Sequence, residues 1–204
     1  NTAENGDTLI TLTDDAIITL KNSNSPAAGN VIITGSILQG EVLTADISSI
    51  SDGDGLGEFS YQWFADDVVI DEASDSTLKL SQSEVDKAIT VKVSYTDGDG
   101  TVEKLVSSAS GAVVNVNDAP NIFTTASLTT DEDTAIAAIA FSGSDIDGDD
   151  LTFSFSNPAK GTVTDNDDGT FTYTPDAHVN GSDSFIITAN DGTVDVTETV
   201  NVAI

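Results

Sequence analysis

Arginine, cysteine and methionine are absent from this chain of 204 residues, and its only strong bases are six lysines. Without cysteine, no disulfide can cross-link the fold, although export from the cell is still compatible with that absence. Without clusters of Lys and Arg, binding to nucleic acid, to anionic membrane surfaces or to phosphate-rich substrates is disfavoured. No run of about 18 apolar residues occurs, so we expect no direct membrane insertion. Because no initiator Met is present, we expect the chain to be a piece of a longer protein.

The groups that most catalytic sites need are also scarce. His178 is the one histidine, and no cysteine is available as a nucleophile. The patterns G-x-S-x-G and H-E-x-x-H and a glycine-rich phosphate loop do not occur. A carboxylate pair could in principle hydrolyse a glycoside, but the acids here cluster in Gly/Asp turns. We therefore expect no enzymatic activity.

Negative charge is the dominant feature of the composition. Asp and Glu together number 35, and the formal net charge is −29. Such an excess destabilises the compact state by self-repulsion unless cations neutralise part of it. The composition fits either a salt-adapted surface or a cation-binding protein, so the placement of the acids must decide.

Apolar residues alternate with polar ones in short segments throughout the chain. In the clearest segment, Ala88 to Tyr95, the side chains of Ile89, Val91, Val93 and Tyr95 alternate with Thr, Lys and Ser. This period of two is typical of half-buried strands, and no stretch has a helical period. Strand-like segments separated by Gly, Asp, Asn and Ser clusters predict an all-β fold of antiparallel sandwiches.

Two acidic loops occur twice, in the same order. Asp52 and Asp99 are 47 residues apart and Asp145 and Asp191 are 46 apart, so the chain repeats with a period of about 93. A repeat of this length predicts two successive domains, 29–117 and 118–204. Residues 1–28 are predicted to form a hairpin, or the tail of a preceding or split module, with strands around Thr13-Asp14-Asp15. The full loops read Ser51-Asp52-Gly53-Asp54-Gly55 and Asp99-Gly100-Thr101-Val102-Glu103, then Ser144-Asp145-Ile146-Asp147-Gly148 and Asp191-Gly192-Thr193-Val194-Asp195.

The repeated loops have the composition of calcium sites. Ca²⁺ takes about six to eight oxygen ligands, and Asp-x-Asp within a turn places two carboxylates on one side of the loop. The densest stretch, Asp145 to Asp150, is not an EF-hand, because Asp150 stands where that loop needs Gly and Ser156 where it needs Glu. One such loop could be a plain turn. Recurrence of the pattern favours an ion site.

Several motifs follow one another in a fixed order along each predicted domain. In the second domain they are Asn117-Asp118-Ala119-Pro120, Asp131-Glu132-Asp133-Thr134, 144–149, 169–175 and 181–185. With these motifs, residues 118–204 resemble the bacterial cadherin-like repeat of giant surface proteins, particularly RTX adhesins. In the first domain the motifs are Gly40-Glu41-Val42-Leu43, 59–63 and 89–97, and with them residues 30–117 resemble the bacterial immunoglobulin-like repeats of the same proteins. The resemblance implies two tandem Greek-key β-sandwich domains, Ig-like then cadherin-like, in an elongated arrangement.

In cadherins, calcium lies between successive modules, and the resemblance carries this role to matching residues here. At the joint between the domains, the implied Ca²⁺ ligands are Asn117, Asp118, Asp145, Asp147 and Asp191, and Asp149 in the same acidic loop is a sixth candidate metal ligand. Glu132 would serve a following module at the opposite pole. Asp52, Asp54, Asp97 and Asp99 would hold an ion against whatever precedes the first domain. For the other pole of that domain the choice stays open among Asp66, Asp67, Glu84 and Asp86.

The resemblance leads to one main functional expectation. The chain would be a calcium-rigidified stalk or extender of a large secreted adhesin at the bacterial cell surface, projecting binding domains in cell adhesion and biofilm formation. Its partners would be Ca²⁺ and neighbouring modules of the same chain. Two alternatives stay open: a region that recognises a host or biofilm glycan, a peptide or a like module, and an accessory module of a secreted polysaccharide-degrading enzyme. Trp63 fits either a core position or a sugar-stacking platform.

Overall fold

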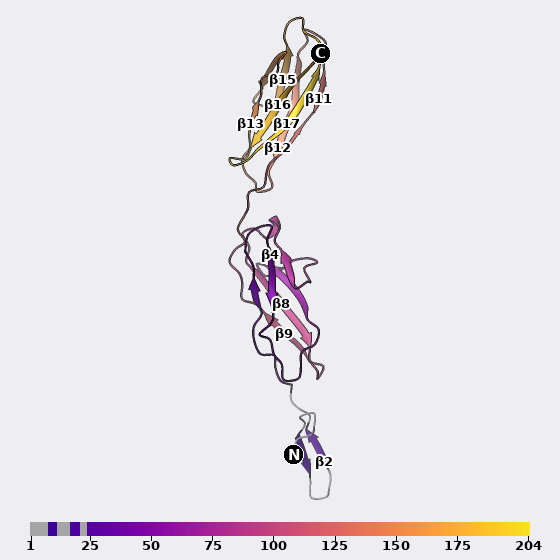
Figure 1. The fold of residues 1–204 in the computed structure, drawn as a ribbon, viewed down its shortest axis with the longest axis vertical. Helices are drawn as coiled ribbons and strands as arrows, with labels where there is room; N and C mark the ends of the chain where they lie inside the picture. Colours follow the sequence, from indigo (N-terminus) through magenta and orange to yellow (C-terminus); the bar gives the residue numbers. More distant parts are fainter. Residues whose placement is uncertain (1–7, 12–16, 21–23) are drawn as a thin grey trace. The chain divides into compact units, whose positions relative to one another are not determined.

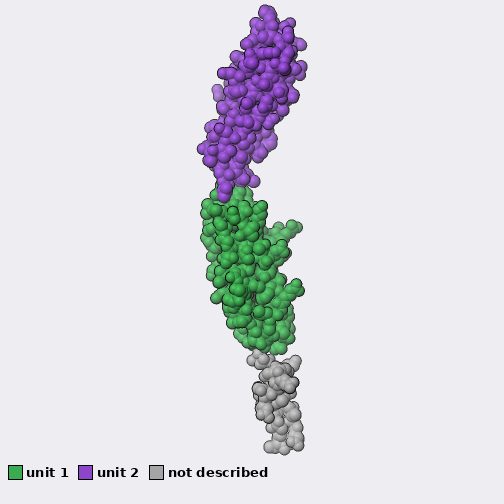
Figure 2. Space-filling model, viewed as in Figure 1, with its two compact units in different colours: residues 1–115 green, residues 116–204 purple. Residues whose placement is uncertain are grey.

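The computed structural model describes residues 8–11, 17–20 and 24–204. Strands make up nearly all of its regular structure, which confirms the predicted all-β class (Figure 1). The chain divides into two compact units, Asn1–Asn115 and Val116–Ile204 (Figure 2), and each is described by itself below. Within the described ranges, no helix is long and apolar enough to cross a membrane.

The first unit is a sandwich of two sheets. One sheet has the order β3-β4-β7 and the other the order β6-β5-β8-β9. Parallel bridges from Leu38 to Val114 and from Val85 to Val113 tie the end of the unit to the segments around Leu38 and Val85. Two further strands, β1 and β2, pair antiparallel, and the predicted turn Thr13-Asp14-Asp15 lies outside the described residues. The bounds are β1 (Thr8–Thr11), β2 (Ile17–Leu20), β3 (Ile32–Thr34), β4 (Val42–Asp46), β5 (Ser60–Ala65), β6 (Val68–Val69), β7 (Thr77–Lys79), η1 (Gln82–Glu84), β8 (Ile89–Thr96) and β9 (Val102–Val106).

The core of the first unit follows from the alternation along β8. Its residues Ile89, Val91, Val93 and Tyr95 are all buried, as their spacing predicts. Trp63 on β5 is fully buried against them, and its indole N–H donates a hydrogen bond of 2.9 Å to the carbonyl of Asp75. Trp63 is therefore a core residue and has no face free to stack on a sugar.

The second unit is also a two-sheet sandwich. Its sheets have the orders β10-β12-β15-β14 and β11-β17-β16-β13. All neighbouring strands are antiparallel except β11 and β17, which pair in parallel. The acidic stretch 166–169 joins β14 to β15 as a hairpin turn, a connection that Asn, Asp and Gly residues favour. The bounds are β10 (Asn121–Thr124), β11 (Ser127–Thr129), β12 (Ile136–Ser144), β13 (Thr152–Phe155), β14 (Gly161–Asp165), β15 (Thr170–Pro175), β16 (Ser182–Asn190) and β17 (Asp195–Ala203).

A buried carboxylate organises the core of the second unit. Asp183 accepts hydrogen bonds from the hydroxyl of Tyr173 (2.8 Å) and from the backbone N–H groups of Ala159, Lys160 and Ser184 (2.9 to 3.0 Å). Burial alone would raise the pKa of Asp183, but these hydrogen bonds outweigh it and hold the pKa below its usual value. The ionised carboxylate thus ties β15, β16 and the 159–160 turn together.

This carboxylate predicts a specific acid sensitivity. Because the pKa of Asp183 is lowered on folding, its ionisation stabilises the fold above the unfolded-state pKa of about 3.9, and that contribution is lost as the pH falls through the folded-state pKa. We expect the stability difference between the native chain and Asp183→Asn to be constant from pH 7 to pH 5 and to shrink below about pH 4. Urea unfolding at several pH values measures it. The exposed Asp131→Asn is the matched control, and a difference independent of pH would contradict the assignment.

Candidate metal sites

The loop that follows β12 gathers three carboxylates. Oxygens of Asp145, Asp147 and Asp149 all lie within 4.8 Å of one another. The backbone N–H of Asp147 donates to Oδ1 of Asp145 at 2.8 Å, which folds the loop back on itself. Gly148 continues the turn at φ +82°, a conformation that residues with a side chain rarely adopt. The local sequence therefore dictates a loop that directs its acids together.

Two oxygens in this loop are buried without a partner. Oδ2 of Asp145 and Oδ1 of Asp147 accept no hydrogen bond. A buried, charged oxygen without a partner is strongly unfavourable, and a hard cation removes that penalty. The mutual repulsion is also visible at Asp149, whose pKa is raised by desolvation and then by the carboxylates of Asp145 and Asp147. The donor set, which is all oxygen and strongly negative, fits calcium.

The linker between the two units is hydrogen-bonded to one carboxylate of this group, Asp147, and to a further carboxylate, Asp191. The backbone N–H of Asp118 donates to Oδ2 of Asp147 at 2.7 Å, and the side-chain amide of Asn117 donates to Oδ2 of Asp191 at 2.9 Å. Hydrogen bonds, first from the N–H of Val194 and then from Asn117, lower the pKa of Asp191 and keep it ionised. The structure thus brings all six residues predicted for this joint to one end of the second unit.

An acidic group of the same kind lies in the first unit. Oxygens of Asp52, Asp54 and Asp97 lie within 4.8 Å of one another, and the N–H of Asp54 donates to Oδ1 of Asp52 at 2.9 Å. Asp97 is only 6% exposed, and its Oδ2 has no hydrogen-bond partner. Asp99, also predicted as a ligand, is exposed and lies outside the group, while its N–H donates to Oδ1 of Asp97.

Four residues around this group escaped the sequence interpretation. The N–H of Ser25 donates to Oδ2 of Asp54, and the side-chain amide of Asn24 donates to Oε1 of Glu103 at 3.0 Å. The hydroxyl of Tyr95 donates to Oδ2 of Asp52 at 2.6 Å. A signal for the first two was present, because Asn24-Ser25-Pro26 resembles the Asn117-Asp118-Ala119-Pro120 linker.

No such group is found at the opposite poles among the described residues. Glu132 is exposed in the segment before β12, at the other end of that strand from Asp145. Its neighbour Asp133 pairs with His178 at 3.3 Å. In the first unit, Glu84 caps η1 through hydrogen bonds from the N–H and hydroxyl of Ser81. Among the residues that the structure describes, only the two groups above bring together three side chains able to hold a metal.

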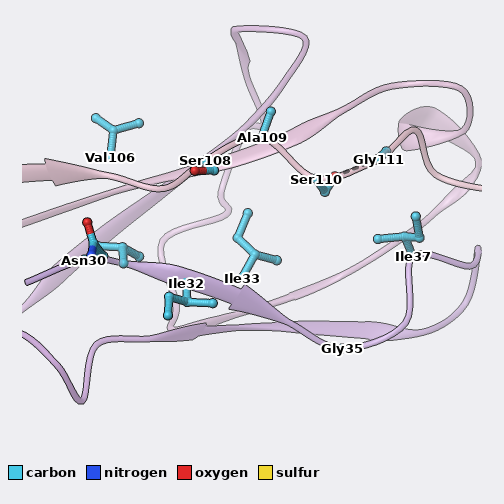
Figure 3. Close-up of a pocket in the computed structure, with 11 residues that line it drawn as sticks. Asn30, Ile32, Ile33, Gly35, Ile37, Val106, Ser108, Ala109, Ser110 and Gly111 are labelled. Atoms are coloured by element: carbon cyan, nitrogen blue, oxygen red, sulfur yellow. Dashed lines mark hydrogen bonds between the residues drawn. The ribbon is translucent and has the colours of Figure 1, made fainter.

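The first unit also has a hollow of about 560 Å³ between β3 and the segment that follows β9 (Figure 3). Apolar side chains such as Ile33 and Ile37 line it, together with the hydroxyls of Ser108 and Ser110. None of the lining residues ionises. The acidic groups, and not this hollow, therefore carry the distinctive chemistry of the chain.

Comparison with known proteins finds a family that the second unit is similar to. The family of bacterial cadherin-like domains matches residues 117–204, so the match begins at the linker asparagine bonded to Asp191. Cadherin-like domains are extracellular adhesion or extender modules in general character. No curated protein sequence matches the chain.

Several solved structures are similar to this chain in part. The three N-terminal domains of the bacteriophage RB49 Highly Immunogenic Outer Capsid protein are 19% identical, with a TM-score of 0.31, covering 86% of this chain and 59% of that one. Drosophila N-cadherin EC1-3 is 12% identical, with a TM-score of 0.37 and coverage of 92% and 70%. An endo-fucoidan hydrolase from glycoside hydrolase family 107 is 12% identical, with a TM-score of 0.32 and coverage of 97% and 33%. This chain thus spans about three fifths of the capsid protein fragment and a third of the hydrolase.

Proposed function

We propose that this chain is an extracellular extender segment of a large bacterial surface adhesin, in which calcium bound at the start of the second unit stiffens the joint between the units. One observation carries the proposal. The linker residues Asn117 and Asp118 are hydrogen-bonded to Asp191 and Asp147, and Asp147 also offers a buried oxygen without a partner. An ion held by that oxygen would therefore secure the linker as well as the loop.

Asp145, Asp147 and Asp149 would hold the ion, with Asp191 beside them. When bound, calcium would supply the positive charge that offsets the repulsion among these carboxylates. The N–H of Asp118 and the amide of Asn117 already orient Asp147 and Asp191, so little rearrangement of the loop is needed. Magnesium is a poorer fit, because it demands near-octahedral geometry and retains its waters.

The linker is short enough for calcium binding at this site to affect the stiffness of the joint. The N–H of Val114 donates to the carbonyl of Ile37 in the first unit, and Asn117 is anchored in the second. Only two residues separate these anchored positions. Ions that bind the ordered joint alone stabilise it by mass action, so millimolar extracellular calcium would stiffen a joint that is loose at low calcium.

The remaining buried acids support a binding role over catalysis. Glu84 and Asp183 are both tied into hydrogen bonds that hold neighbouring backbone in place, and hydrogen bonding lowers the pKa of each despite burial. Neither is poised to exchange a proton near neutral pH. We accordingly propose that the chain itself catalyses no reaction and acts at the cell surface by spacing the domains attached to it.

Small-angle X-ray scattering of the full chain tests the stiffened joint. In calcium we expect a narrow distribution of distances between the two units, and in excess chelator a broad one. Asp147→Asn should scatter like the chelated protein even in calcium, because it removes charge from the oxygens that face the ion. Identical scattering with and without calcium, in protein whose carboxylates are intact, would refute the proposal.

A further inference from the structure

We propose that the first unit carries a second calcium site of lower affinity, formed by Asp52, Asp54 and Asp97 and weakened by the phenol of Tyr95. The two sites would then fill one after the other as calcium rises. The existence of the second site is independent of the function proposed above, whereas the order of filling rests on calcium binding at the joint. The observation that points to a ligand is Asp97, which is 94% buried yet has an oxygen without any partner.

The backbone around the two groups follows one plan. Each unit has an Asp-x-Asp loop that is closed by a hydrogen bond from the backbone N–H of its second Asp to Oδ1 of its first. The accepting residue is Asp52 in the first unit and Asp145 in the second. In each, the N–H of an entering residue, Ser25 or Asp118, donates to Oδ2 of the second Asp. A segment that leads into the sandwich is therefore hydrogen-bonded to the acidic group in both units.

The third carboxylate is also equivalent. Asp97 follows the last residue of β8, and Asp191 follows the last residue of β16. Each accepts two backbone hydrogen bonds on its Oδ1, so each carboxylate is held in a fixed orientation. The donors are the N–H groups of Asp99 and Thr101 for Asp97, and those of Thr193 and Val194 for Asp191. This shared scaffold in a unit outside the cadherin-like match supports a cation site there.

Two differences make the first-unit site weaker. The hydroxyl of Tyr95 donates to Oδ2 of Asp52, whereas the matching oxygen of Asp145 has no partner and Ala189 stands at the position of Tyr95. A cation in the first-unit site must either share Oδ2 of Asp52 with the Tyr95 hydroxyl or displace that hydroxyl. The carboxylate of Asp149 is also missing from the first unit, because its loop has Leu56 at that position. Calcium affinity follows the number of charged ligands, so fewer free carboxylate oxygens mean weaker binding.

The order of filling has a physical consequence along the chain. As calcium rises, the linker at Asn117 would be secured first, and Asn24 and Ser25 second. As calcium falls, Asn24 and Ser25 would be released while the linker at Asn117 stays held. The chain would thus respond to calcium in two steps, set by one tyrosine hydroxyl and one leucine.

Titration of the full ¹⁵N-labelled chain with calcium chloride tests this, followed by amide NMR. The amides of Thr101 and Thr193 report the two sites separately, because they donate to Asp97 and Asp191. We expect Thr193 to shift at lower calcium than Thr101. Asp97→Asn should abolish the Thr101 transition alone, and Asp147→Asn should abolish the Thr193 transition alone.

Tyr95→Phe tests whether the Tyr95 hydroxyl lowers the calcium affinity of the first-unit site or only supports the fold. It frees Oδ2 of Asp52 and should move the Thr101 transition to calcium concentrations at least about threefold lower, or about 0.65 kcal/mol at RT ≈ 0.59 kcal/mol. Tyr61→Phe, which removes a phenolic hydroxyl from the neighbouring strand β5, should leave the Thr101 transition at the same calcium concentration. A Thr101 amide that does not respond to calcium, or a transition that Tyr95→Phe weakens, overturns the inference even if Thr193 behaves as expected. If Thr193 fails to respond, the proposed function fails instead.

Discussion

Calcium at a hundredfold excess over its dissociation constant should raise the unfolding temperature of the second unit by roughly 10 to 20 °C. Binding to the folded state alone contributes about 2.7 kcal/mol under these conditions, and about 1 kcal/mol shifts the midpoint of a domain of this size by roughly 4 to 8 °C. The physical source is the pair of buried oxygens on Asp145 and Asp147 that have no partner. Differential scanning calorimetry of the full chain in calcium and in chelator measures the shift.

Matched variants separate the site from general screening of the negative charge. Asp147→Asn should lose most of the rise, since it removes one of the orphaned charged oxygens. Asp167→Asn removes one charge from the exposed turn between β14 and β15 and should keep the rise. If the two variants respond alike, calcium acts only by screening, and the site at the joint does not exist.

Trp63→Ala should destabilise the first unit by about 3 to 5 kcal/mol, the range for removing a large buried aromatic side chain. Trp63 is 0% exposed, and its indole N–H satisfies the carbonyl of Asp75, so the substitution leaves both a cavity and an acceptor without a partner. Calorimetry should show an early transition for the first unit, with the transition of the second unit unchanged.

A milder variant keeps this prediction testable if the alanine variant does not fold. Trp63→Phe retains most of the buried ring area but loses the hydrogen bond, so its effect should be smaller than that of alanine. Val68→Ala, at a side chain that is 69% exposed on β6, should change stability by less than about 0.5 kcal/mol. Equal stability of Trp63→Ala and the native chain would contradict a core role for Trp63.

The strands of this chain could be predicted because their alternation is regular. The segment at 88–95 placed Val91 and Val93 in the core, and β8 spans Ile89–Thr96. Which strands become neighbours could not be read in the same way. The parallel pairing of β11 with β17 joins residues about 75 positions apart, and no local pattern encodes a contact of that range.

The acidic groups were predicted in part. Recurrence of Asp-x-Asp identified Asp52, Asp54, Asp145 and Asp147. The structure places the first two in one acidic group and the last two in another. The late loop of the first unit has two Asp-Gly steps, so the sequence could not distinguish Asp97 from Asp99. The end of β8 distinguishes them, because the chain turns after Asp97 and leaves Asp99 in solvent.

The parallel pairing of β11 with β17 has a mechanical consequence. A pull on the second unit from its two ends draws β11 towards the start of the unit and β17 towards its end. Because these neighbouring strands point the same way, that pull slides one along the other, and the three residue pairs from Ser127↔Asn201 to Thr129↔Ala203 bear the load together. An antiparallel pair pulled apart from one end would instead open one pair at a time. The parallel pairing thus favours resistance of the second unit to tension along the chain.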